Sequence, residues 1–223
     1  MRSRRRQRLE YLIAAYGPSL AKNIHVDLIW RIECGDEPSL YLTFDDGPTR
    51  HLTPRILDVL DRYDVPATFF LLGKHLAGSP EAVKSIEDGG HRIGLHGFDH
   101  LDAWSVDLPT ILADLNRGFS VLSSQVSSPL RFFRPPYGRF RKGTRRWARE
   151  NELAIVMWDV MPGDFMAGVS AGKIVSRVIR RVRNGSIIVL HDSWNPHVVQ
   201  NTVASLKAML PILKDEGWRF EIL

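Results

Sequence analysis

The sequence predicts an α/β fold in a single domain, built on a mainly parallel sheet of about seven strands. From Ser39 onward, short apolar runs alternate with amphipathic segments, which is typical of strands and helices taking turns around such a sheet. The length of 223 residues and the hydrophobic content of 44% are enough to bury one sizeable core. Polar clusters directly follow several of the apolar runs, as expected where parallel strands end at one face.

The expected strands are short apolar runs bounded by turn residues or by polar clusters. The run that ends at Phe44 and the run from Ile187 to Leu190 are the most continuous. Continuous rather than alternating hydrophobicity indicates strands that are buried on both faces. The expected strands are residues 40–44, 67–71, 91–95, 131–133, 154–158, 186–190 and 219–223.

The expected helices have either clear starts and stops or a regular apolar stripe. Thr53 with Pro54, and Ser79 with Pro80, are typical helix starts, and Gly89 follows the end of the second helix. Apolar residues of the other segments recur at intervals of three and four, which core packing explains. The expected helices are residues 54–63, 80–88, 108–122, 174–182 and 199–213.

Residues 1–38 are expected to form a basic N-terminal segment, a helix and a linker that pack on a domain formed by residues 39–223. Glu10 interrupts the first apolar run and Gly17-Pro18 ends it, so we interpret the basic start as a solvated terminus rather than a secretion signal or membrane tether. No segment reaches the roughly 20 apolar residues needed to cross a bilayer. The sequence thus predicts a soluble protein, and leaves open whether it lies in the cytoplasm or the cell envelope. The basic start contains Arg2, Arg4, Arg5, Arg6 and Arg8.

Charge and cysteine content narrow the kinds of site that the chain can build. The formal charge of +5 and the pI of about 9.6 favour contact with an anionic polymer. The basic run has no interleaved aromatic residues, however, which disfavours nucleic acid as a partner. Cys34 is the only cysteine, so an intrachain disulfide is excluded and zinc ligands would have to be His, Asp or Glu.

Polar residues that are suited to catalysis or metal binding lie at the carboxyl ends of the expected strands. Because parallel strands deliver these ends to one face, the residues are expected to share one site. Two adjacent carboxylates, Asp45 and Asp46, would repel each other, and a cation would relieve that repulsion. An acidic surface turn is the alternative for this pair. The other residues at strand ends are His96, Arg134, Asp159, His191 and Asp192.

His96 and His100 are four residues apart, which brings both imidazoles within reach of one ion if the segment coils back after its strand. Each could alternatively be a hydrogen-bonded packing residue. Together with Asp46 they would form a two-histidine, one-carboxylate face that leaves coordination positions open, as catalytic metals require.

Two further strand ends carry residues suited to binding or proton transfer. Arg134, held by the prolines that follow it, has a guanidinium that can grip a carboxylate through two parallel hydrogen bonds, or form a surface salt bridge. His191 can donate or accept a proton near neutral pH, or merely cap a strand edge. Trp158 and Phe165 could line an apolar slot beside the metal, although core packing also explains them.

Five ordered motifs in this chain resemble those of the polysaccharide deacetylase family, the carbohydrate esterases that include chitin and peptidoglycan deacetylases. The likeness extends from Leu40 to about Asp192. The motifs are Thr43-Phe44-Asp45-Asp46-Gly47-Pro48, the segment from His96 to His100, Arg134-Pro135-Pro136-Tyr137, the segment from Asp159 to Phe165, and Leu190-His191-Asp192.

The resemblance implies a distorted (β/α) barrel of seven strands and a metal-dependent hydrolase that removes N-acetyl groups from sugars of the N-acetylglucosamine type in a glycan. It implies that Asp46, His96 and His100 bind a divalent metal, zinc before cobalt, nickel or manganese. Asp45 would be the catalytic base and His191 the general acid. Arg134 would hold Asp45, and the backbone N–H of Tyr137 would help to bind the oxyanion. The residues expected to contact the substrate are Leu190, Phe165, Trp158 and Pro135.

The chain departs from the family pattern at two motifs. Gly97 stands where the family generally has Ser or Thr, so a hydrogen bond that shapes the ligand loop is expected to be missing. In the fourth motif Met161 replaces an Asp and Phe165 replaces a Trp. Either Asp159 or Asp164 could therefore be the residue that orients His191.

Two other functions remain open from sequence. One is a glycan-binding protein whose deacetylase site has decayed. The other is a hydrolase with the same site that cleaves an O-acetyl ester or a non-sugar amide, since related barrels host different acyl substrates. The sequence leaves the glycan, the metal and the oligomeric state undetermined.

Overall fold

The centre of the structure is a parallel sheet in the order β1-β6-β5-β4-β3-β2-β7, with β8 paired to β2. The computed structural model describes residues 28–33 and 35–223. β3 pairs with the second half of β2, whereas β8 pairs with its first residues. The strands are β1 (Leu28–Ile29), β2 (Ser39–Asp45), β3 (Thr68–Leu71), β4 (Arg92–Leu95), β5 (Phe132–Phe133), β6 (Ala154–Val156), β7 (Ser186–His191) and β8 (Arg219–Glu221).

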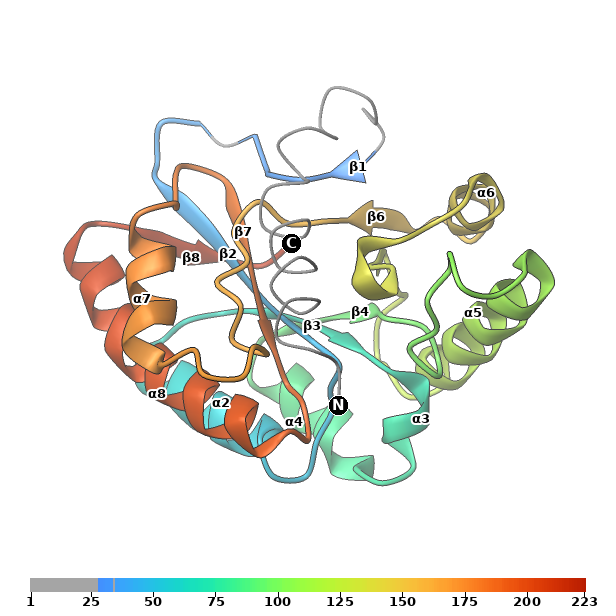
Figure 1. The fold of residues 1–223 in the computed structure, drawn as a ribbon, viewed down its shortest axis with the longest axis horizontal. Helices are drawn as coiled ribbons and strands as arrows, with labels where there is room; N and C mark the ends of the chain where they lie inside the picture. The colour runs from blue at the N-terminus through green and yellow to red at the C-terminus, as the bar shows by residue number, and fades with distance from the viewer. Residues whose placement is uncertain (1–27, 34) are drawn as a thin grey trace.

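The sheet curls into a distorted barrel. Beyond β6, Val160 forms a parallel bridge to Ile188 of β7, and Arg31 forms an antiparallel bridge to Ser186. These bridges draw the two ends of the strand order together. Helices lie around the outside of the curled sheet (Figure 1). The single-domain α/β prediction is thus confirmed. All seven expected strands are present, and β1 is an eighth that the sequence did not predict.

The longest strands are buried on both faces. In β2, Leu40, Leu42, Thr43 and Phe44 have no exposed surface, and Ile187 to Leu190 of β7 are equally covered. Strands of a parallel sheet need apolar residues on both faces, because helices cover one face and the barrel interior fills the other. This burial fixes where β2 and β7 end, and hence where Asp45 and His191 lie.

The helices agree with the sequence where an apolar stripe is present. The five expected helices are found, with ends shifted by a few residues. Thr53 lies inside α2 rather than capping it, since the N-cap is Leu52. Neither α3 nor α6 was predicted. The helices are α2 (Thr53–Arg62), α3 (Gly73–Leu76), α4 (Pro80–Asp88), α5 (Leu108–Ser123), η1 (Pro136–Gly138), α6 (Lys142–Glu150), α7 (Ala171–Ile179) and α8 (Pro196–Asp215).

The expected N-terminal helix and most of the basic segment lie outside the described residues, so the division at residue 38 stays a prediction. Residues 28–29 belong to the sheet, because β1 pairs with β6. Within the described part of the chain, no helix combines the length and apolar character that a bilayer crossing requires.

Candidate active site

Asp45 is held at the end of β2 by a buried arginine. Its Oδ1 accepts a hydrogen bond of 2.7 Å from Nη1 of Arg134. The same nitrogen donates to the hydroxyl of Thr43 at 2.8 Å. The other guanidinium nitrogens donate to the backbone carbonyls of Val156 and Met157. Arg134 has no exposed surface, so this network fixes both the arginine and the carboxylate.

The expected two parallel hydrogen bonds between Arg134 and a carboxylate are not formed. One guanidinium nitrogen reaches Asp45, because the others are taken by carbonyl groups at the end of β6. A buried guanidinium has five N–H groups to satisfy, and Asp45 alone cannot accept them all. The arrangement leaves Oδ2 of Asp45 directed elsewhere, 4.0 Å from Nε2 of His96.

Asp46, His96 and His100 meet in a cluster that can hold a metal ion. Each offers one ligand atom, and these atoms lie within 4.8 Å of one another. Oδ1 of Asp46 is 3.5 Å from Nε2 of His96 and 3.2 Å from Nε2 of His100. This oxygen is buried and lacks a hydrogen bond of good geometry within the described residues, as expected of an atom whose partner is a cation. We name these three residues the metal triad.

The protonation states of His96 and Asp46 are also compatible with a bound cation. Nδ1 of His96 donates to the carbonyl of Arg134 at 2.7 Å, which leaves the lone pair on Nε2 for a metal. Burial alone would raise the pKa of Asp46, but the imidazoles of His100 and His96 hold that pKa well below its usual value. The carboxylate is therefore ionised at neutral pH, and two imidazoles with one carboxylate form a donor set typical of zinc.

A buried carboxylate behind the triad fixes the turn that carries Asp46. Asp192 accepts hydrogen bonds from the hydroxyls of Thr49 (2.7 Å) and Thr53. A Cβ on Gly47 would lie 2.4 Å from Oδ2 of Asp192, so any larger residue in this turn would have to displace the buried carboxylate. On the other side, His75 contacts the carbonyl oxygen of Asp46 through Nδ1 at 2.8 Å. The backbone of Asp46 is thus held from two directions.

His191 ends the neighbouring strand β7, close enough to Asp45 and Asp46 for their charges to act on its imidazole. In the sheet register it is the partner of Asp45. Its Nδ1 is 2.9 Å from Oδ1 of Asp164, and its backbone N–H donates to Oδ2 of the same carboxylate at 2.7 Å. Asp159, the other candidate partner, instead accepts from Ile187 N and the hydroxyl of Ser186. The orienting partner of His191 is therefore Asp164.

The comparison with known proteins identifies the family. The polysaccharide deacetylase family model matches residues 33–156, more than half of the chain. The chain belongs to the polysaccharide deacetylase family. It is 37% identical over 182 residues to a peptidoglycan-N-acetylglucosamine deacetylase of Bacillus cereus, covering 82% of this chain and 66% of that protein, just under two thirds. It is 36% identical over 193 residues to a chitooligosaccharide deacetylase of Sinorhizobium fredii, covering 81% of this chain and 88% of that protein.

Solved structures of the family agree with the fold. The structure of a peptidoglycan N-acetylglucosamine deacetylase in complex with 4-naphthalen-1-yl-N-oxidanyl-benzamide has a TM-score of 0.84 and 33% sequence identity, and the match covers 91% of this chain and 94% of that one. A family pseudoenzyme from Bacillus anthracis has a TM-score of 0.76 at 26% identity, covering 86% and 66% of the two chains. Membership of the polysaccharide deacetylase family is therefore compatible with both active and inactive proteins, so the residues of the site decide the function.

The remaining residues predicted for the site differ in how exposed they are. Tyr137 is 46% exposed, and its ring contacts that of His100 at 4.5 Å between centroids. Phe165 is half-buried against His191, with ring centroids 5.0 Å apart. Leu190, Trp158 and Pro135 are buried. Among these residues, Tyr137 and Phe165 thus present the most surface beside the triad and His191.

Asp114 is a site residue that the sequence analysis missed. This buried carboxylate of α5 accepts hydrogen bonds from the backbone N–H groups of Phe98 (2.9 Å) and Asp99 (2.8 Å). Both lie in the loop between the two triad histidines. Gly97 has a φ of +87°, and a Cβ there would lie 2.9 Å from Oδ2 of Asp114. The loop therefore does have shaping hydrogen bonds, which come from a helix rather than from residue 97.

Asp114→Asn is expected to weaken metal binding by roughly 10–100-fold, as for other residues that hold metal ligands in place. The amide would turn a donor toward one of the two backbone N–H groups, so the loop would lose its fixed shape. Competition with a chelator of known affinity measures the effect. The matched control is Asp107→Asn on the same helix, because Asp107 caps α5 by accepting from Thr110 and does not contact the loop. Equal metal affinity in both variants would contradict this role for Asp114.

Asp164→Asn is expected to move the alkaline limit of activity to lower pH. Burial by itself would lower the pKa of His191, but the charge and hydrogen bond of Asp164 raise it to about 9, from an ordinary value of 6.5. If the protonated imidazole is the active form, activity is retained below pH 9 and falls as pH rises through that pKa. Without the Asp164 charge the falling limb should shift toward 6.5 in a profile of kcat/KM against pH.

Asp159→Asn is the control for that profile. It removes a carboxylate that anchors Ile187 and Ser186 without touching His191. An alkaline limb that moves in the Asp159 variant, and stays in place in the Asp164 variant, would reverse the assignment.

Proposed function

We propose that this protein is a metal-dependent hydrolase that removes N-acetyl groups from sugars of the N-acetylglucosamine type in a glycan and releases acetate. One observation carries the proposal. The ends of β2, β4 and β7 bring a possible metal triad, an arginine-held carboxylate and an aspartate-paired histidine together. The named relatives are deacetylases that act on peptidoglycan and chitooligosaccharides, which supports the same bond for this chain.

The triad is proposed to hold zinc, before cobalt, nickel or manganese, with Asp46, His96 and His100 as its protein ligands. Three protein ligands leave one coordination position of the metal open, as in catalytic zinc sites. A divalent metal, when bound, supplies Lewis acidity, which polarises a carbonyl oxygen and makes a water molecule more acidic. The side chains around the triad then have to move two protons and bind the substrate.

Asp45 is proposed as the general base. Arg134 holds its Oδ1, so Oδ2, which lies on the His96 side, is the oxygen that takes a proton from the attacking water. The amine that leaves is strongly basic, and it departs only if a proton arrives with it. Nε2 of His191 is the proposed donor, because Nδ1 is occupied by Asp164.

The remaining contacts are proposed to bind the acetyl group. Tyr137 has a left-handed backbone conformation with a φ of 59°, and its ring contacts that of His100. We assign its backbone N–H to the oxyanion. Phe165, packed on His191, is proposed to contact the acetyl methyl. Leu190, Trp158 and Pro135 are buried, and they are proposed to support this contact surface from beneath. Excluding water from these groups strengthens the hydrogen bonds that stabilise the oxyanion.

Acetate release from a small panel of substrates tests the proposal. The panel contains a peptidoglycan fragment, a chito-oligosaccharide, an O-acetylated xylan and a non-sugar acetamide, each with and without a chelator. We expect release from an N-acetylated glycan, loss with chelator and recovery when zinc is added back. Release from the xylan alone would identify an esterase. Bound metal without release from any substrate would indicate a glycan-binding protein with a decayed site.

A further inference from the structure

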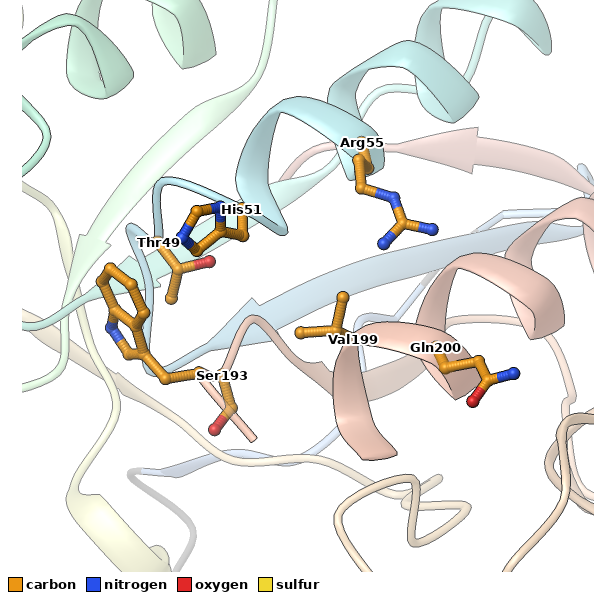
Figure 2. A pocket seen from close by; sticks show the side chains of 7 residues that line it. Thr49, His51, Arg55, Ser193, Val199 and Gln200 are labelled. Carbon is orange, nitrogen blue, oxygen red and sulfur yellow. The ribbon is translucent and has the colours of Figure 1, made fainter. Parts of the chain in front are cut away.

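A pocket of about 390 Å³ opens beside the proposed active site. It lies between the segment that leads into α2 and the start of α8. Figure 2 shows Arg55 from α2 and Val199 from α8 directed toward the same space, with His51 at its other end. Trp194 also lines the pocket, and its ring contacts that of His51. We name it the Trp194 pocket. None of the residues that line it is a carboxylate.

The Trp194 pocket adjoins the metal triad through one side chain. The ring of Trp194 contacts the ring of His75 at 6.3 Å between centroids, and His75 contacts the carbonyl oxygen of Asp46. Thr49, which also lines the pocket, donates to Asp192. A glycan whose acetylated sugar lies at the triad would therefore place its neighbouring unit near this pocket.

Trp194 has the properties of a sugar-stacking platform. It is 47% exposed, and in the described part of the chain the other exposed large hydrophobic side chains are Trp104, Tyr137 and Ile212. His51 contacts it edge-on, with an interplanar angle of 88°, and so steadies the indole at its edge. Exposed apolar surface that is fixed in place and rimmed by polar residues marks ligand-binding grooves, and an indole combines an apolar face with a polar edge.

Arg55 gives the pocket a charge preference. It is exposed, and no residue in the described part of the chain forms an ion pair or hydrogen bond with its guanidinium. The guanidinium fork matches a carboxylate in geometry and charge. With no acidic residue lining the pocket, a carboxylate entering it would meet a cation and no competing anion.

We propose that the Trp194 pocket binds the glycan unit next to the acetylated sugar, and that Arg55 selects a unit that carries a carboxylate. This inference rests on the proposed function and refines it. The substrate class becomes an acidic glycan rather than a neutral polymer of N-acetylglucosamine. Trp194 contributes affinity for the sugar ring, and Arg55 contributes the discrimination between charged and neutral units.

The test compares two forms of one substrate. A peptidoglycan oligosaccharide of defined length is used with free carboxylates, and the same oligosaccharide is used after its carboxylates have been converted to amides. For the unmodified protein, kcat/KM for acetate release should be higher with the free carboxylates. An exposed ion pair is worth up to roughly 1 kcal/mol, so the preference is expected to be about fivefold.

Arg55→Ala should bring the ratio of the two kcat/KM values toward one. Trp194→Ala should lower kcat/KM for both forms, roughly two- to tenfold, mainly by raising KM. The matched control is Arg62→Ala, because Arg62 is an exposed arginine at the other end of the same helix, and it should keep the ratio of the unmodified protein.

Each outcome decides a separate point. An Arg55 variant that keeps the preference would overturn the charge role, and a Trp194 variant with unchanged KM would overturn the stacking role. If the unmodified protein releases no acetate from either form, the proposed function fails. The pocket is then tested by calorimetric titration with the same two oligosaccharides, where tighter binding of the acidic form that is lost in Arg55→Ala supports the pocket, and equal or absent binding refutes it.

Discussion

Replacing His96 with alanine is expected to abolish stable metal binding and, with it, measurable acetate release. His96 is almost fully buried, and its Nε2 is aimed at Asp46 because Nδ1 is bound to the carbonyl of Arg134. Removing residues that only support ligands costs roughly 10–100-fold in metal affinity, and removing a ligand should cost at least as much. Elemental analysis of the purified protein, with a chelator competition for the residual affinity, measures the loss.

His91→Ala is the matched control. His91 directly precedes β4 and His96 directly follows it, so the two substitutions lie at opposite ends of one strand. Burial lowers the pKa of His91 to about 4, and the neutral ring accepts a hydrogen bond from Ala67 far from the triad. We expect full metal occupancy in this variant. Full occupancy in His96→Ala as well would remove His96 from the ligand set, whereas loss in both would indicate a folding defect.

The strand ends explain why so much of the site could be predicted from sequence. Asp45, His96, Arg134 and His191 each follow or close a strand whose apolar run is readable, and the geometry of parallel strands brings such positions to one face. The position of such a residue can be predicted without knowing the paths of the loops or helices. The sequence therefore predicted which residues meet, although it could not predict how they bond.

Contacts made by loops and helices could not be predicted in the same way. Asp164 and Asp159 are five residues apart, and which of them reaches His191 depends on the path of the segment after β6. Asp114 lies in a predicted helix, but its contacts with the ligand loop join residues that are 16 and 15 positions apart. Propensity and periodicity carry no information on these long-range pairs.

The missed helix α6 has a different cause. Its sequence, Lys142–Glu150, is dominated by charged residues, and the buried positions are Thr144, Trp147 and Ala148. One aromatic residue between small ones does not form a readable apolar stripe. Trp147 is nonetheless anchored, because its ring contacts Phe133 and its Nε1 donates to Asn116. Tertiary packing rather than local pattern therefore determines this helix.

Asp45→Asn is expected to keep the metal and lose most turnover. The triad is intact in this variant, but an amide cannot take a proton from water, so kcat should fall roughly 10²–10⁴-fold. Arg134 would also lose the counter-charge of its buried guanidinium, which costs about 3–5 kcal/mol of unfolding free energy. Metal content, kcat and a denaturant unfolding curve, all measured on one preparation, separate the chemical effect from the structural one.

Asp99→Asn is the control that isolates the base. It makes the same change of charge and shape at an exposed residue next to His100, so any general effect of removing a negative charge near the triad appears in both variants. Only Asp45 pairs with Arg134 and has its second oxygen turned toward His96. If Asp45→Asn turns over as fast as Asp99→Asn at equal metal content, the proton must go to another group. The carboxylate of Asp45 would then serve only to hold Arg134 in place.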